Sequence, residues 1–177
     1  MEEHENYEEL PPENPPKWKK PLIFVMGLFM VGLMISFIFV TFPVGDILAG
    51  YSESSSIKNN ILEGDGVRLV FEGDTYKQLL QWYNDELSLE IVVCLKGSKE
   101  GSNYLINELY KPTTYAQAYN HVRFAPCEES VVLLHTHPHK RCIASETDIN
   151  TLKDSQKINP DLLMAVMCEG DRISIYE

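Results

Sequence analysis

The sequence predicts an α+β domain that is preceded by one transmembrane helix. The helix is indicated by residues 21–44, a run without a single charged side chain. At ~1.5 Å per residue this run spans the ~30 Å hydrocarbon layer of a bilayer, and it exceeds the ~7–15 apolar residues of a signal-peptide core. In the rest of the chain, short apolar runs that suit strands are mixed with segments of helical periodicity. That mixture is typical of an α+β fold.

Length and charge narrow the classes of function. The 177 residues have room for about one folded domain. The net charge of −11 argues against nucleic acid as a partner, because binding to phosphates needs clustered basic residues. The cysteines are too few and too scattered for a disulfide framework and form no C-x-x-C pair, so they do not indicate the redox compartment. They are Cys94, Cys127, Cys142 and Cys168.

The chain is predicted to contain four segments. Residues 1–20 hold six glutamates and four prolines with almost nothing apolar to bury, so they are expected to be a disordered tail. Residues 21–44 form the transmembrane helix, residues 45–65 a connector, and residues 66–177 the folded domain.

The basic residues around the apolar run predict its orientation. Lys17, Lys19 and Lys20 directly precede the run, whereas the nearest basic residue downstream is Lys58. Cytoplasmic flanks are enriched in Lys and Arg. We therefore expect a single-pass protein in the lipid bilayer with a cytoplasmic N-terminus and an external folded domain.

The first half of the domain has signals for two strands with a helix between them. Apolar alternation in 67–71 indicates a strand. Asp74 can cap a following helix, and 91–95 is a continuous apolar run that indicates a buried strand ending at Gly97. The apolar face of that helix would consist of Tyr76, Leu79, Leu80 and Tyr83.

The second half of the domain adds further strands and a second helix. Strands are expected at 103–110, 121–125, 131–134, 162–167 and 173–176. Ser145 opens a helix that Asn159 and Pro160 close. The last two strands are predicted to pair as a hairpin around Gly170 and Asp171.

Residues with metal-binding chemistry gather in one stretch after the strand 131–134. His135 and His137 lie on either side of Thr136, and side chains two apart in a strand point to the same face. Ser145 begins a helix after seven intervening residues, where it can cap the backbone while Asp148 turns back toward the histidines. Two imidazoles and one carboxylate leave a fourth tetrahedral position for water, which is typical of a catalytic zinc.

This stretch resembles the signature of the JAB/MPN/JAMM metalloproteases, a family that includes the proteasome-lid deubiquitinase. The signature is H-x-H-P followed by S-x-x-D, with seven residues between the second His and the Ser, and residues 135–138 and 145–148 match it without gaps. An upstream glutamate on a strand that ends in glycine is matched by residues 90–97. The resemblance covers roughly residues 66–177, and the first 50 residues have no counterpart in it.

The resemblance implies a JAB1/MPN-like (cytidine-deaminase-like) fold, a mixed sheet flanked by helices, and it implies specific roles. His135, His137 and Asp148 would bind Zn²⁺. Glu90 would accept a proton from the water that zinc activates, and Ser145 would donate a hydrogen bond to the oxyanion of the substrate. Glu86 is the competing base, but it falls at a predicted helix end and lacks the glycine seven residues downstream.

The resemblance also implies a membrane-anchored zinc metalloprotease that hydrolyses peptide or isopeptide bonds in a protein substrate. Ubiquitin-like conjugates and membrane proteins are the candidate substrates. The family's known conjugates are cytosolic, so this substrate class argues for a cytoplasmic catalytic domain, the reverse of the orientation that the lysines predict. The alternative is a membrane-tethered MPN interaction or scaffold domain without catalysis. Such scaffolds have usually lost ligands, and this chain keeps all of them.

The segment between the histidines and the second helix departs from the family pattern. His139, Lys140 and Arg141 replace the small residues that many relatives carry, so the substrate preference does not follow from the resemblance. Cys142 lies in the same segment. The resemblance places water rather than a thiolate at the fourth position of the metal, so Cys142→Ser is expected to retain both zinc and activity.

Overall fold

A computed structural model of the chain describes residues 16–42, 44–118 and 121–177. Most of the predicted acidic tail, residues 1–15, lies outside the described residues. The chain divides into two compact units, Met1–Pro43 and Val44–Glu177, and each is described by itself.

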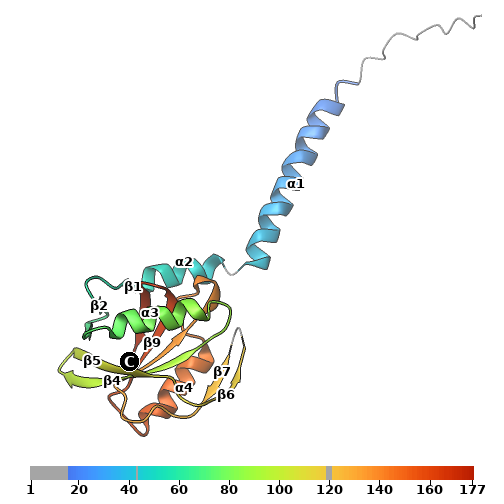
Figure 1. Ribbon diagram of the computed structural model, residues 1–177. Helices are drawn as coiled ribbons and strands as arrows, with labels where there is room; N and C mark the ends of the chain where they lie inside the picture. Colours follow the sequence, from blue (N-terminus) through green and yellow to red (C-terminus); the bar gives the residue numbers. More distant parts are fainter. Residues whose placement is uncertain (1–15, 43, 119–120) are drawn as a thin grey trace, which may run out of the picture. The chain divides into compact units, whose positions relative to one another are not determined.

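The first unit contains the helix α1 (Lys19–Thr41) (Figure 1). Its 23 residues correspond to a length of about 34 Å at ~1.5 Å per residue. None of its side chains is buried, and it is long and apolar enough to cross a membrane. The prediction of one apolar N-terminal helix is therefore confirmed. Pro21 is accommodated because it lies in the first helical turn, where backbone N–H groups have no intrahelical partner.

The second unit is built on an eight-stranded mixed sheet in the order β1-β10-β9-β8-β4-β5-β3-β2. Its strands are β1 (Ser55–Ser56), β2 (Ile61–Gly64), β3 (Val67–Phe71), β4 (Val92–Glu100), β5 (Asn103–Tyr110), β8 (Val132–Thr136), β9 (Leu163–Glu169) and β10 (Arg172–Tyr176). Two neighbouring pairs, β3 with β5 and β8 with β9, are parallel, and the other pairs are antiparallel. The edge strands β1 and β2 contact each other, so the sheet is nearly closed. The α+β class is confirmed.

Each face of the sheet is covered by a helix. Alternate residues of β4, such as Val93 and Leu95, point into a large core that includes Leu79 of α3 (Thr75–Asp85). The residues between them point to the other face, where Val92 packs with Leu152 of α4 (Glu146–Gln156) (Figure 1). A hairpin of β6 (Thr114–Gln117) and β7 (Val122–Phe124) also covers this second face.

A bulge in β4 explains the glycine that ends the predicted strand motif. The pairing of β4 with β5 shifts register between Lys96 and Gly97. A Cβ on Gly97 would overlap the carbonyl oxygen of Leu105 on β5, so this position accepts only glycine without a shift of the backbone. The strand continues past the bulge to Glu100, beyond the predicted end.

The segment expected as a connector, residues 45–65, is folded. It contributes α2 (Val44–Glu53), β1 and β2 to the second unit. Asn59 and Asn60 adopt left-handed φ angles of 52° and 62° and form the turn before β2. The sequence is interpreted as a connector because its Ser/Gly-rich composition is typical of a linker, and that composition conceals the helix and the short strands.

All four cysteines form disulfide bonds, contrary to the expectation from their spacing. Cys94 is bonded to Cys127 and Cys142 to Cys168, with Cα–Cα distances of 5.6 and 5.0 Å. The partners are 33 and 26 residues apart in the sequence. The spacing of the cysteines did not predict the bonds because each joins a strand residue, Cys94 of β4 or Cys168 of β9, to a loop residue that is distant in the sequence.

Candidate metal centre and catalytic site

The two histidines lie at the end of β8, in the middle of the sheet. His135 belongs to β8 and pairs with Val92 of β4 on one side and Val166 of β9 on the other. His137 follows the end of the strand, and its backbone N–H donates to the Met167 carbonyl of β9 at 2.9 Å. Both imidazoles are buried, and their ring centroids are 4.9 Å apart. The strand period therefore places both side chains on one face, as predicted.

Thr136, between the histidines, fixes the position of this segment relative to β4. Its backbone N–H donates to the Ile91 carbonyl at 3.0 Å, and its hydroxyl accepts from the Ile91 N–H at 3.1 Å. Ile91 directly follows Glu90. The two hydrogen bonds thus set the spacing between the histidine pair and the candidate base.

Asp148 reaches the histidines from the first turn of α4. Ser145 is the N-cap residue, and its Oγ accepts from the Asp148 N–H at 3.2 Å. The Asp148 Oδ2 accepts from the Ser145 N–H at 2.6 Å, which completes a capping box. This reciprocal pair holds the carboxylate at the helix N-terminus with Oδ2 directed toward the imidazoles.

Three ligand atoms converge at this point. Asp148 Oδ2 lies 3.4 Å from His135 Nε2 and 3.3 Å from His137 Nε2. The potential ligand atoms of the three residues lie within 4.8 Å of one another, so the group could hold a metal ion. His135 Nε2 is buried and has no hydrogen-bond partner of acceptable geometry among the described residues. Because a buried polar atom without a partner is costly, this nitrogen is suited to a metal ligand.

The electrostatics of the group favour metal binding. Burial lowers the pKa of His135, so its imidazole is neutral and can offer a lone pair. Burial by itself would raise the pKa of Asp148, but its contacts with His135, His137 and Ser145 outweigh burial and hold that pKa well below its usual range. The set therefore consists of a neutral imidazole and an ionised carboxylate, which are the forms that coordinate cations.

Glu90 completes the site from a position two residues before β4, so it precedes the strand rather than lying on it as predicted. Its carboxylate oxygen Oε1 lies 3.7 Å from His137 Nε2, and the residue is buried. Burial raises the pKa of Glu90 to about 7, and the interaction with His137 opposes the shift. A small cavity of about 40 Å³ is lined by Glu90, His135, Ser145 and Asp148, among others. Glu86 does not line it and instead forms the C-terminal cap of α3.

Two further sets of hydrogen bonds hold Glu90 and His137 in place, and the sequence motif does not predict them. Gln117 at the end of β6 donates from Nε2 to the Glu90 carbonyl at 2.9 Å, and the Glu90 N–H donates to the Ala118 carbonyl at 3.1 Å. The Arg141 carbonyl lies 3.0 Å from His137 Nδ1. A carbonyl can only accept, so Nδ1 carries the hydrogen and Nε2 is free for the metal. Backbone carbonyls have no side-chain signature, which is why sequence patterns cannot reveal them.

No protein-family model matches this chain, and no curated protein matches it significantly. The chemistry assigned to the site therefore depends on its donor set, its burial and its geometry.

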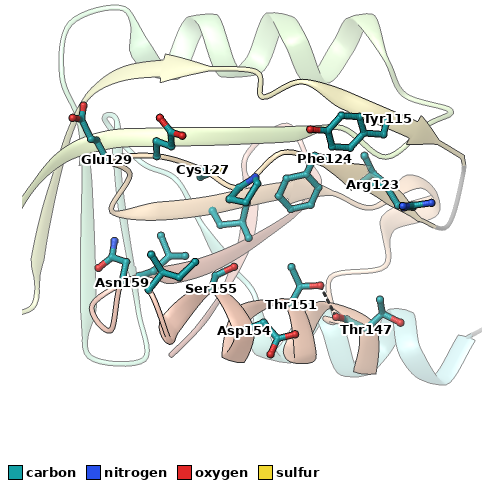
Figure 2. Close-up of a pocket in the computed structure, with 16 residues that line it drawn as sticks. Tyr115, Arg123, Phe124, Cys127, Glu129, Thr147, Thr151, Asp154, Ser155 and Asn159 are labelled. Carbon is teal, nitrogen blue, oxygen red and sulfur yellow. Dashed lines mark hydrogen bonds between the residues drawn. The ribbon is translucent and has the colours of Figure 1, made fainter.

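A larger pocket of about 900 Å³ adjoins the metal centre. It lies between the β6–β7 hairpin and α4, and Figure 2 shows Tyr115 and Phe124 on the opposite side of the pocket from Thr151 and Ser155. The residues that line both this pocket and the small cavity at the metal centre are Val122, Phe124, Leu133, Thr147 and Thr151. The pocket therefore lies next to the small cavity at the metal-binding group, and the two share part of their lining.

Proposed function

We propose that this protein is a membrane-anchored zinc peptidase of the JAB/MPN/JAMM type that hydrolyses peptide or isopeptide bonds. The observation that carries the proposal is the buried group of His135, His137 and Asp148 with the Glu90 carboxylate 3.7 Å from one of its nitrogens. Two imidazoles, one carboxylate and a nearby glutamate are the parts needed for metal-assisted hydrolysis. The buried Nε2 of His135 makes no hydrogen bond of acceptable geometry among the described residues, which is a further reason for a metal at this place.

The roles of the residues follow from their positions. Bound zinc would supply a water of lowered pKa and would polarise the carbonyl of the substrate. Glu90 accepts the proton of the attacking water and returns it to the leaving amine, which suits a carboxyl group with a pKa of about 7. Ser145 Oγ already accepts a hydrogen bond from the Asp148 N–H, so its own O–H remains to donate to the oxyanion of the substrate.

The large pocket is the proposed site for the substrate chain. It is more apolar than polar in its lining, with Tyr115, Phe124 and Ile158 among its residues. Tyr115 and Ile158 are 68% and 82% exposed, respectively. An apolar groove beside a hydrolytic centre suits the side chains of an extended peptide, such as the tail of a ubiquitin-like protein or a segment of a membrane protein.

The proposal is tested with the purified full-length chain in detergent. We expect about one zinc per chain by elemental analysis, and cleavage of an extended peptide or of a ubiquitin-like fusion that a chelator abolishes and added zinc restores. A folded protein that binds no zinc and cleaves no peptide would favour the interaction or scaffold domain instead.

We also propose that the folded domain lies outside the cytoplasm. Lys17, Lys19 and Lys20 precede α1 and favour a cytoplasmic N-terminus. The two disulfide bonds are an independent support, because disulfides persist in oxidising compartments and are rare in the cytosol. With this orientation, membrane-associated or exported proteins are better candidate substrates than cytosolic conjugates.

Protease added to intact cells or spheroplasts is therefore expected to remove a tag at the C-terminus and to leave a tag at the N-terminus intact. Alkylation without reduction is expected to label none of the four cysteines, because all of them are bonded. Permeabilised cells serve as the control, in which both tags are lost. A C-terminal tag that resists protease until the membrane is broken would reverse the orientation and make a cytosolic ubiquitin-like substrate the better candidate.

A further inference from the structure

The segment between His137 and α4, residues 138–144, is here called the metal loop. Its contribution to the site is the Arg141 carbonyl, which lies 3.0 Å from His137 Nδ1. That hydrogen bond selects the tautomer of His137 and fixes the plane of its ring. The position of the Arg141 backbone therefore determines whether His137 Nε2 points at the other ligand atoms.

One side of the metal loop is fastened to the sheet. Cys142, which follows Arg141, is bonded to Cys168 of β9. The Cys142 carbonyl accepts from the Ser174 hydroxyl of β10 at 2.6 Å, and Lys140 Nζ lies 2.8 Å from Glu169 Oε1. These contacts leave the loop little freedom to move along β9 and β10.

The other side of the metal loop is closed by α2. Gly50 is buried, and a Cβ placed on it would lie 2.9 Å from the Cys142 nitrogen and 3.0 Å from the Cys142 Cβ. One helical turn earlier, Asp46 Oδ2 lies 3.3 Å from Arg141 Nε. The helix backbone thus contacts the loop directly at the residue beside the Arg141 carbonyl, and only glycine permits this approach.

The C-terminal end of α2 is also held in place. Arg172 of β10 donates through Nη2 to the Tyr51 carbonyl at 2.7 Å and to the Ser54 carbonyl at 2.9 Å. Its guanidinium lies over the Tyr51 ring at 3.9 Å from the centroid. These donors satisfy carbonyls that a helix end leaves without partners, so α2 is a fixed part of the unit.

We infer that α2, the helix that follows the membrane-spanning segment in the sequence, is a positioning element of the metal centre. Gly50 packs directly against Cys142, and Asp46 forms an ion pair with Arg141. Together these contacts hold the Arg141 carbonyl within hydrogen-bond distance of His137 Nδ1. This role rests on the proposed metal site. Gly50 acts through the loop and His137, so it is a positioning residue and touches neither metal nor substrate.

The test compares Gly50→Ala with Gly45→Ala in the full-length chain. Both substitutions add a methyl group within α2, but no atom of the residues that the structure describes lies within 4 Å of a Cβ on Gly45. Loss of a partner that orients a metal-binding histidine typically costs ~10–100-fold in metal affinity. We therefore expect that fall in zinc affinity, measured by chelator competition, for Gly50→Ala, and wild-type affinity for Gly45→Ala.

A second readout does not depend on zinc. In the metal-free protein, ¹⁵N shifts of the His137 imidazole are expected to report the Nδ1–H tautomer in the wild type and in Gly45→Ala, and a mixture of tautomers in Gly50→Ala. Wild-type zinc affinity and a single tautomer in folded Gly50→Ala would overturn the inference. A wild type that binds no zinc would overturn the proposed function, whereas the tautomer comparison would still decide the role of α2.

If Gly50→Ala does not fold, Asp46→Ala takes its place. Asp46 and Arg141 are about half exposed, and removal of such a pair is expected to lower zinc affinity about twofold to fivefold. Unchanged affinity and an unchanged His137 tautomer in Asp46→Ala would then overturn the inference.

Discussion

Replacement of Glu90 by glutamine is expected to abolish hydrolysis while the protein keeps its fold and its zinc. Glutamine has nearly the shape of the protonated carboxyl group but cannot accept a proton. The backbone hydrogen bonds of residue 90, to Gln117 and Ala118, do not involve the side chain that is changed. Loss of a general base typically costs ~10²–10⁴ in rate, so kcat is expected to fall by at least ~100-fold.

The matched control for this experiment is Glu86→Gln. Glu86 caps the end of α3 and does not line the cavity at the metal centre, so its substitution is expected to leave hydrolysis unchanged. The measurement is the rate of cleavage of one peptide substrate, together with zinc content and the thermal unfolding curve of each variant. Activity that survives Glu90→Gln and disappears with Glu86→Gln would show that the base was assigned to the wrong glutamate.

The ligand group could be predicted from the sequence because each of its parts follows a local rule. Alternation along a strand places His135 and His137 on one face, and the structure has both imidazoles buried side by side. The S-x-x-D pattern is a capping signal that ties Asp148 to Ser145 over one helical turn. Such rules involve only residues close in sequence, so they can be applied without knowledge of the fold.

Features that depend on contacts distant in sequence were not predicted. The disulfide between Cys142 and Cys168 forms because β8 and β9 are parallel neighbours, and a crossover connection of this kind cannot be read from cysteine spacing. The bond also changes the expectation for Cys142→Ser, since that substitution would leave a free thiol at Cys168 and loosen the loop that orients His137. The folded segment around α2 was missed because its composition resembles a linker.

The second prediction with a large expected effect is the loss of zinc affinity when a metal ligand is replaced. His137→Ala and Asp148→Asn are each expected to lower zinc affinity by more than the ~10–100-fold that loss of an outer-shell partner costs, because each removes one of three protein ligands. Asparagine at 148 can still accept the Ser145 N–H through its side-chain oxygen, so the helix cap is retained and the charged ligand alone is lost. The measurement is chelator competition on full-length protein, with circular dichroism to show that each variant is folded.

The variant Ser145→Ala is expected to lower the stability of the protein without loss of the metal. Its hydroxyl accepts the Asp148 N–H, and removal of an N-cap side chain costs ~0.5–2 kcal/mol of unfolding free energy. This variant is therefore expected to unfold at a lower temperature than Asp148→Asn in the metal-free state and yet to retain zinc, because His135, His137 and Asp148 are unchanged. Its rate of hydrolysis is expected to fall by ~10²–10³, since it also lacks the donor to the oxyanion. If His137→Ala and Asp148→Asn bind zinc as tightly as Ser145→Ala does, the metal lies elsewhere in the protein and the assignment of this centre is wrong.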